Sequence, residues 1–119
     1  MFGQVPDVEH VSALEAIELA QGESVLLDVR ETWEWQLGHA PGSVNVPMSE
    51  IESRHDELDF DATFLVICHA GHRSVTVTDA LARAGYNAIN VDGGMLAWQF
   101  AGGEVIEGSD GASDDSTRA

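Results

Sequence analysis

Short apolar runs that alternate with helical patterns constrain the fold of this chain more than any other feature. Buried strands are expected at residues 25–29, 64–67 and 88–91, where mostly apolar residues lie between polar or turn residues. Shorter strands are expected at residues 8–11 and 43–46. Because strands separated by helices form βαβ units, the sequence predicts an α/β domain with a parallel sheet of about five strands and helices on both faces.

Helical patterns occupy the segments between the strands. The first helix begins with the capping-box sequence from Ser12 to Glu15 and is expected to end at Gly22. Further helices are expected over residues 32–37, 49–58, 73–84 and 95–100. Ser49 is the expected cap of the 49–58 helix.

The helix expected over residues 73–84 carries an apolar stripe. The stripe consists of Val77, Ala80, Leu81 and Ala84. This spacing places side chains on one face of a helix, so we expect these four residues to pack against the sheet.

Cys68 is the only cysteine, and it lies between the clearest predicted strand and the 73–84 helix. The connecting loop reads Cys68-His69-Ala70-Gly71-His72-Arg73-Ser74. A sulfur atom in this position faces backbone N–H groups and the positive end of a helix, and both favour the thiolate. Ligands of open parallel sheets bind beyond the carboxyl ends of the strands. Cys68 is therefore a candidate nucleophile, and the alternative is a buried structural cysteine.

The residues that follow Cys68 suit an anionic substrate. A planar guanidinium at Arg73 can bind an anion in two places, or form an ordinary ion pair. Gly71 permits backbone angles that direct several N–H groups inward, although a turn glycine would look the same. His69 and His72 either assist binding or are solvated loop residues. Two histidines and a thiol without a clear fourth ligand do not predict a metal site.

The charge balance argues against several classes of partner. The chain has 21 acidic residues and five arginines, with no lysine, and its formal net charge is −16. No nucleic-acid or anionic-membrane partner is therefore expected. No apolar run approaches the roughly 20 residues that span a bilayer, and the first residues lack a signal-peptide pattern. We expect a soluble cytoplasmic protein.

The composition divides the chain into two parts. Residues 1–106 have the length and apolar content of one domain. Residues 107–119 are acidic and have almost nothing to bury, so we expect a disordered tail. A single cysteine permits no disulfide within the chain, which fits a reducing compartment.

Three separated groups of residues have the form of known family signatures. The first group is Asp28-Val29-Arg30 with Glu34, then Gly38-His39 and Pro41-Gly42-Ser43 with Asn45. The second is the loop from Cys68 to Ser74, of the form Cys-x-x-Gly-x-Arg-Ser. The third is Gly93-Gly94 followed by Trp98. In this order and spacing they resemble the single-domain rhodanese-like sulfurtransferases.

The resemblance implies a rhodanese-like fold and catalysis through a persulfide. Cys68 would take the outer sulfur of a small anionic donor such as thiosulfate, and cyanide, a thiol or a protein would accept that sulfur. The implied substrate-binding residues are Arg73, His69, Ala70, Gly71, His72 and Ser74. No metal or other cofactor is implied.

Asp28 and Arg30 are expected to support this site. They end a predicted strand at the same edge of the sheet as Cys68, and strand alternation places both side chains on one face. An ion pair between them is predicted, and in the family such a pair resembles a scaffold for the active-site region. The loop departs from the commonest family form at His69-Ala70 and His72, which leaves Arg73 as its only permanent cation.

Three other functions remain open from the sequence. A phosphatase or arsenate reductase would use a Cys-x5-Arg loop, whereas Cys68 and Arg73 enclose four residues. A non-catalytic binding or regulatory module of the same fold is a second alternative. A carrier that takes persulfide sulfur from a cysteine desulfurase is a third. With no second cysteine in the chain, any persulfide must be resolved by an acceptor from outside.

Overall fold

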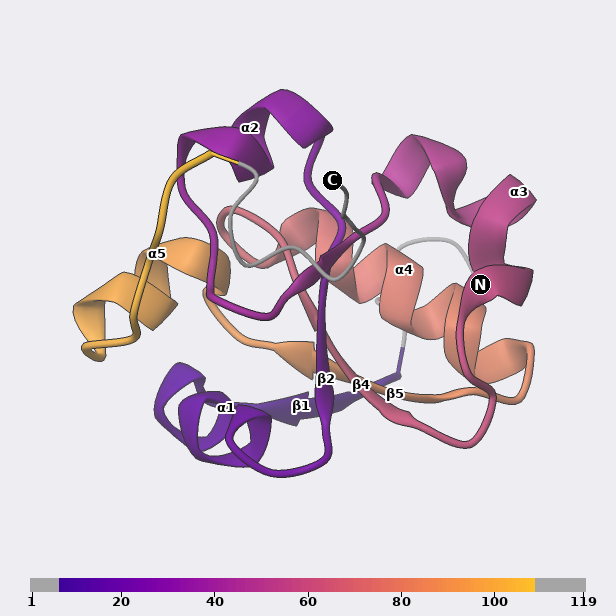
Figure 1. The fold of residues 1–119 in the computed structure, drawn as a ribbon. Helices are drawn as coiled ribbons and strands as arrows, with labels where there is room; N and C mark the ends of the chain where they lie inside the picture. Colours follow the sequence, from indigo (N-terminus) through magenta and orange to yellow (C-terminus); the bar gives the residue numbers. More distant parts are fainter. Residues whose placement is uncertain (1–6, 109–119) are drawn as a thin grey trace.

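A five-stranded parallel sheet forms the centre of the protein, as the sequence predicts (Figure 1). The computed structural model describes residues 7–108. The strands are β1 (Glu9–Val11), β2 (Val25–Asp28), β3 (Val44–Asn45), β4 (Thr63–Ile67) and β5 (Asn87–Val91). Their order is β1-β5-β4-β2-β3, and each neighbouring pair is parallel. The strand that leads to Cys68 is therefore the middle strand of the sheet.

Helices connect the strands and cover both faces of the sheet (Figure 1). They are α1 (Ala13–Ala20), α2 (Thr32–Leu37), α3 (Ile51–Arg54), α4 (His72–Arg83) and α5 (Gly94–Phe100). Ser12 caps α1 as predicted, because its Oγ accepts the backbone N–H of Glu15 at 3.1 Å. In the part of the chain described here, no helix is long and apolar enough to cross a membrane.

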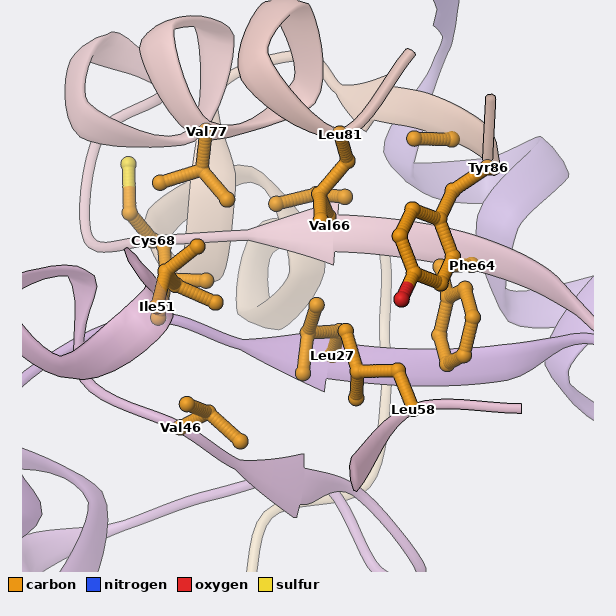
Figure 2. Packing of buried hydrophobic residues seen from close by; sticks show 12 residues of the cluster. Leu27, Val46, Ile51, Leu58, Phe64, Val66, Cys68, Val77, Leu81 and Tyr86 are labelled. Atoms are coloured by element: carbon orange, nitrogen blue, oxygen red, sulfur yellow. The ribbon is translucent and has the colours of Figure 1, made fainter. Parts of the chain in front are cut away.

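Two hydrophobic cores lie on opposite faces of the sheet. Successive side chains of β4 point to alternate faces and so belong to different cores. Phe64 and Val66 pack with residues of α3 and α4 in the first core (Figure 2). Leu65 and Ile67 pack with residues of α1 and α5 in the second. Because every side chain of β4 from Phe64 to Ile67 is buried, the strand reads as a continuous apolar run in the sequence.

The helix predicted over residues 49–58 is wrong in its extent and its cap. The segment consists of the 3₁₀ turn η1 (Met48–Glu50), the short helix α3 and the 3₁₀ turn η2 (His55–Glu57). Glu50 is the N-cap of α3. The hydroxyl of Ser49 instead donates to Glu31, at 3.4 Å, so it is not available to cap a helix.

The stripe predicted for α4 is correct at Val77 and Leu81 and wrong at Ala80 and Ala84, which are exposed. Ser74 and Thr78 take their places on the buried face. Thr78 Oγ1 donates to Ser74 O at 2.7 Å, which satisfies its hydroxyl inside the core. A pattern based on hydrophobicity favoured the alanines because it could not anticipate this hydrogen bond.

The segment after α5 returns along α2. Ile106 forms a bridge with His39, and the N–H of Gly108 donates to Gln36 O at 2.7 Å. These contacts extend two residues past the domain boundary predicted at residue 106. The remaining residues of the predicted tail, 109–119, lie outside the described residues.

Candidate active site

The register of the central strands brings two of the signatures together. Asp28 at the end of β2 is paired with Ile67 at the end of β4, and the N–H of Val29 donates to Ile67 O at 2.9 Å. Cys68 and Arg30 therefore follow neighbouring strands at the same edge of the sheet. This is the edge at which open parallel sheets bind ligands.

The Cys68 sulfur lies at the start of α4 and accepts two backbone hydrogen bonds. The N–H of Gly71 donates to Sγ at 3.1 Å, and the N–H of Ser74 donates at 3.3 Å. The hydroxyl of Ser74 is also 3.3 Å from Sγ. The side chain is only 1% exposed, and Figure 2 shows the sulfur pointing toward the helix that carries Val77. N–H donors and a helix start both stabilise negative charge on sulfur.

Gly71 has to be glycine for this arrangement. It is the N-cap of α4 with φ of 101°, in the left-handed region that other residues rarely adopt. A Cβ atom at this position would also lie 3.0 Å from the backbone N of Gly93. The prediction that Gly71 turns N–H groups inward is consistent with its hydrogen bond to the sulfur.

The Gly93-Gly94 signature holds the loop from the other side. The N–H groups of Met95 and Leu96 in α5 donate to Cys68 O at 2.7 Å and His69 O at 3.1 Å. A Cβ atom on Gly94 would lie 2.5 Å from His69 O and closer still to Cys68 O. The sequence reasoning did not assign this role to Gly94, although the glycine pair was the available signal.

Asp28 and Arg30 form the predicted ion pair. Arg30 Nη2 lies 2.7 Å from Asp28 Oδ2, and Nε donates to both carboxylate oxygens at 3.0 and 3.1 Å. The same guanidinium donates to Gly38 O at 2.7 Å and to Glu34 O at 3.4 Å. The buried pair therefore fixes both ends of α2 against the edge of the sheet.

Arg73 is engaged by a carboxylate of the same chain. Its Nη1 and Nη2 atoms bind the two carboxylate oxygens of Glu34 at 2.8 and 3.0 Å. The hydrogen bonds from Arg73 lower the pKa of Glu34 from 4.5 to about 2, although burial opposes this change. The bond to Glu34 likewise raises the pKa of Arg73. The sequence analysis placed Glu34 in the first signature but did not predict that it would pair with Arg73 and neutralise the loop cation.

In the described part of the chain, the hydrogen-bond partners of the Cys68 sulfur are Gly71 and Ser74, and the other predicted residues of the loop are not among them. His69 and His72 are exposed, and Ala70 is half-buried. Among the hydrogen bonds of residues 7–108, neither histidine contacts Cys68 Sγ. His69 lines a groove of about 350 Å³ between α2 and α5. Within the same residues, no group of three or more His, Cys, Asp and Glu side chains is placed to hold a metal ion.

Comparisons with known proteins agree on one family. A family model described as a rhodanese-like domain matches residues 12–101. A Bacillus subtilis protein named as a sulfurtransferase is 35% identical over 96 residues, which cover 81% of this chain and 92% of that protein. A thiosulfate sulfurtransferase of Pseudoalteromonas translucida is 31% identical over 101 residues, which cover 83% and 96% of the two chains.

A solved structure has the same fold. The crystal structure of a rhodanese-related protein from Thermoplasma volcanium matches with a TM-score of 0.79 at 32% identity. The match covers 82% of this chain and 97% of that chain. The fold predicted from the signatures is thereby confirmed.

Proposed function

Because this chain belongs to the rhodanese-like family, we propose that it is a sulfurtransferase that carries sulfane sulfur on Cys68. The donor is thiosulfate or another small anionic sulfur compound. The acceptor is cyanide in an assay, and a thiol or a protein otherwise. The observation that carries the proposal is the position of the Cys68 sulfur, which accepts the N–H groups of Gly71 and Ser74 at the start of α4.

The proposed transfer takes two steps. In the first, the Cys68 thiolate attacks the outer sulfur of thiosulfate, a new S–S bond forms, and sulfite leaves with the electron pair of the broken bond. In the second, the acceptor attacks the same outer sulfur, and Cys68 leaves as the thiolate. The N–H groups of Gly71 and Ser74 stabilise negative charge on Cys68 before the first step and after the second.

The proposed supporting residues lie around the loop cation. Arg73 supplies the positive charge for an anionic donor, and before a donor binds its guanidinium is paired with Glu34. Asp28 and Arg30 hold α2, the helix that carries Glu34. Because Cys68 is 1% exposed, the proposal requires the loop to move when a donor enters.

Thiocyanate formation from thiosulfate and cyanide tests the proposal. The wild type is expected to turn over, and Cys68→Ser is expected to form no thiocyanate while keeping the wild-type melting temperature. Thiocyanate formation by Cys68→Ser at the wild-type rate would contradict the assignment of Cys68. A wild type that forms none, although its thiol is accessible, would contradict thiosulfate as the donor.

A non-catalytic binding module is the second candidate function. The burial of Cys68 and the pairing of Arg73 with Glu34 both favour it, because each makes the loop less open to a small anion. The two functions differ in one measurable property. A module of this kind would leave Cys68 unmodified after exposure to every sulfur donor, whereas a sulfurtransferase accumulates a persulfide.

A further inference from the structure

A groove beside the Cys68 loop has several apolar side chains in its walls. The groove of about 350 Å³ lies between α2 and α5, which are neighbours in Figure 1. Trp33 and Leu37 line it from α2, and Leu96 lines it from α5. His69, the residue after Cys68, also lines it. An occupant of the groove would therefore lie beside the reactive loop.

The apolar side chains around this groove are exposed without a partner in the described structure. Trp33 is 65% exposed, Leu37 70% and Leu96 53%. Phe100, 97% exposed, lies one turn beyond Leu96 on the same side of α5. Contiguous apolar surface of this kind is typical of a binding face, whereas single exposed apolar residues need no explanation. A small thiol would leave most of this surface uncovered.

The charge around the groove indicates which sign of charge a partner should carry. Each arginine among residues 7–108 is already in an ion pair with a carboxylate. Glu104 and Glu107 are exposed on the segment that returns along α2, where the N–H of Gly108 binds Gln36 O. Val105 of this segment lies against Gly38, which lines the groove. Since the formal net charge of the chain is −16, the excess charge that a partner meets here is negative. A complementary partner is cationic.

We propose that this groove docks a polypeptide that presents a thiol between apolar side chains and lysine or arginine residues. The proposal rests on the proposed function, and it assigns the acceptor. The acceptor thiolate attacks the outer sulfur of the Cys68 persulfide, the bond between the two sulfur atoms of the persulfide breaks, and Cys68 leaves as the thiolate. The acceptor carries the transferred sulfur away as its own persulfide. No other cysteine in the chain can take that role.

Peptide acceptors test the proposal directly. The protein is loaded with thiosulfate or, if loading is incomplete, with polysulfide. Sulfur removal is then timed with Lys-Leu-Cys-Leu-Lys, with Glu-Ser-Cys-Ser-Glu and with cyanide. Each peptide rate is divided by the rate of that peptide with a small disulfide reagent, because flanking charges alter the reactivity of a thiol. The cationic apolar peptide is expected to react at least about tenfold faster, with a smaller preference at high salt.

Groove variants show whether the preference arises at this surface. Trp33→Gln combined with Leu37→Gln, which changes two exposed side chains that line the groove from α2, is expected to reduce the preference to less than about threefold while the cyanide rate stays at its wild-type value. Leu14→Gln, which changes a leucine of α1 that is 61% exposed, is the matched control and is expected to keep the full preference.

The outcomes separate the docking proposal from the function on which it rests. Equal normalised rates for the two peptides, in protein that cyanide unloads, would overturn docking alone. A preference that survives in the groove variant would do the same. Protein that neither donor loads, or that cyanide does not unload, would overturn the proposed function and the docking proposal together.

Discussion

Arg73 holds a carboxylate before any donor arrives. Since its guanidinium binds Glu34 through two atoms, an anionic donor competes with a group of the fold itself. Arg73→Ala is expected to lower kcat/KM for thiosulfate at least about tenfold, because the loop has no other permanent cation. Arg83→Ala, which breaks an exposed ion pair with Asp79 near the end of the same helix, is the control. A loss of less than about threefold for Arg73→Ala would count against its role.

Glu34 is expected to limit the affinity for anionic donors. Glu34→Gln removes the charge that neutralises Arg73, while its side-chain oxygen can still accept the backbone N–H of Glu31 that completes the cap of α2. The KM for thiosulfate is expected to fall about threefold or more, with little change in kcat. Glu31→Gln, in the same turn but outside the ion pair, is the matched control. A rise in KM would mean that Glu34 instead positions Arg73 for the donor.

The lowered pKa of Glu34 predicts how the free energy of unfolding depends on pH. Its pKa is about 2 in the folded protein against an ordinary value of 4.5. The unfolded chain therefore binds this proton first as pH falls, so the ion pair stabilises the fold fully above pH 4.5 and loses this effect as pH falls toward 2.

Urea unfolding at several pH values measures this contribution. Between about pH 5 and about pH 2.5, Glu34→Gln is expected to lose less free energy of unfolding than the wild type. Glu52→Gln, on the exposed surface of α3, is the control and is expected to follow the wild type. If the free energy of unfolding changed with pH in the same way for the wild type and Glu34→Gln, the lowered pKa of Glu34 would be contradicted.

At the scale of elements, the start of α5 is a support for the reactive loop. Gly94→Ala and Gly102→Ala both place a side chain at positive φ, 59° and 92° respectively. A Cβ at Gly94 collides with the carbonyls of Cys68 and His69, whereas a Cβ at Gly102 meets nothing within 4 Å. Gly94→Ala is therefore expected to be destabilised by about 2 kcal/mol more and to lose sulfur transfer.

Thermal unfolding and single-turnover persulfide formation measure these two effects. Gly102→Ala is expected to keep the wild-type rate of persulfide formation, since its strain lies beyond the end of α5. Equal loss of persulfide formation in the two variants would contradict this prediction. It would mean that backbone strain, and not contact with the Cys68 loop, explains the need for glycine at Gly94.

The sequence predicted the positions of most helices and strands better than some of their caps and buried faces. The strand around Leu65 and the cap at Ser12 follow from local chemistry, and both are confirmed. Ser49 failed as a cap because its hydroxyl binds Glu31 of a distant helix start. Ala80 failed as a buried residue because Thr78, whose hydroxyl donates to Ser74 O within α4, is buried on the inner face instead. A tertiary hydrogen bond outweighed the local pattern at Ser49, and a hydrogen bond within the helix allowed a polar residue to replace the alanine in the core.

At the scale of the whole molecule, the sheet topology explains which parts of the site the sequence could predict. The position of Asp28, Arg30 and Cys68 at one edge of the sheet follows from parallel strands alone, so it could be predicted from the sequence. The pair between Glu34 and Arg73 joins residues 39 positions apart, and no periodic pattern encodes such a contact. The groove between α2 and α5 depends likewise on how two helices meet above the loop.

The central claim is that Cys68 carries sulfur, and intact mass after incubation with thiosulfate tests it most directly. The account predicts a gain of about 32 Da in the wild type, absent in Cys68→Ser and reversed by cyanide. Alkylation of the untreated protein shows whether the thiol can be reached despite its burial. No adduct and no alkylation would mean that Cys68 is a buried structural residue, which would contradict the account.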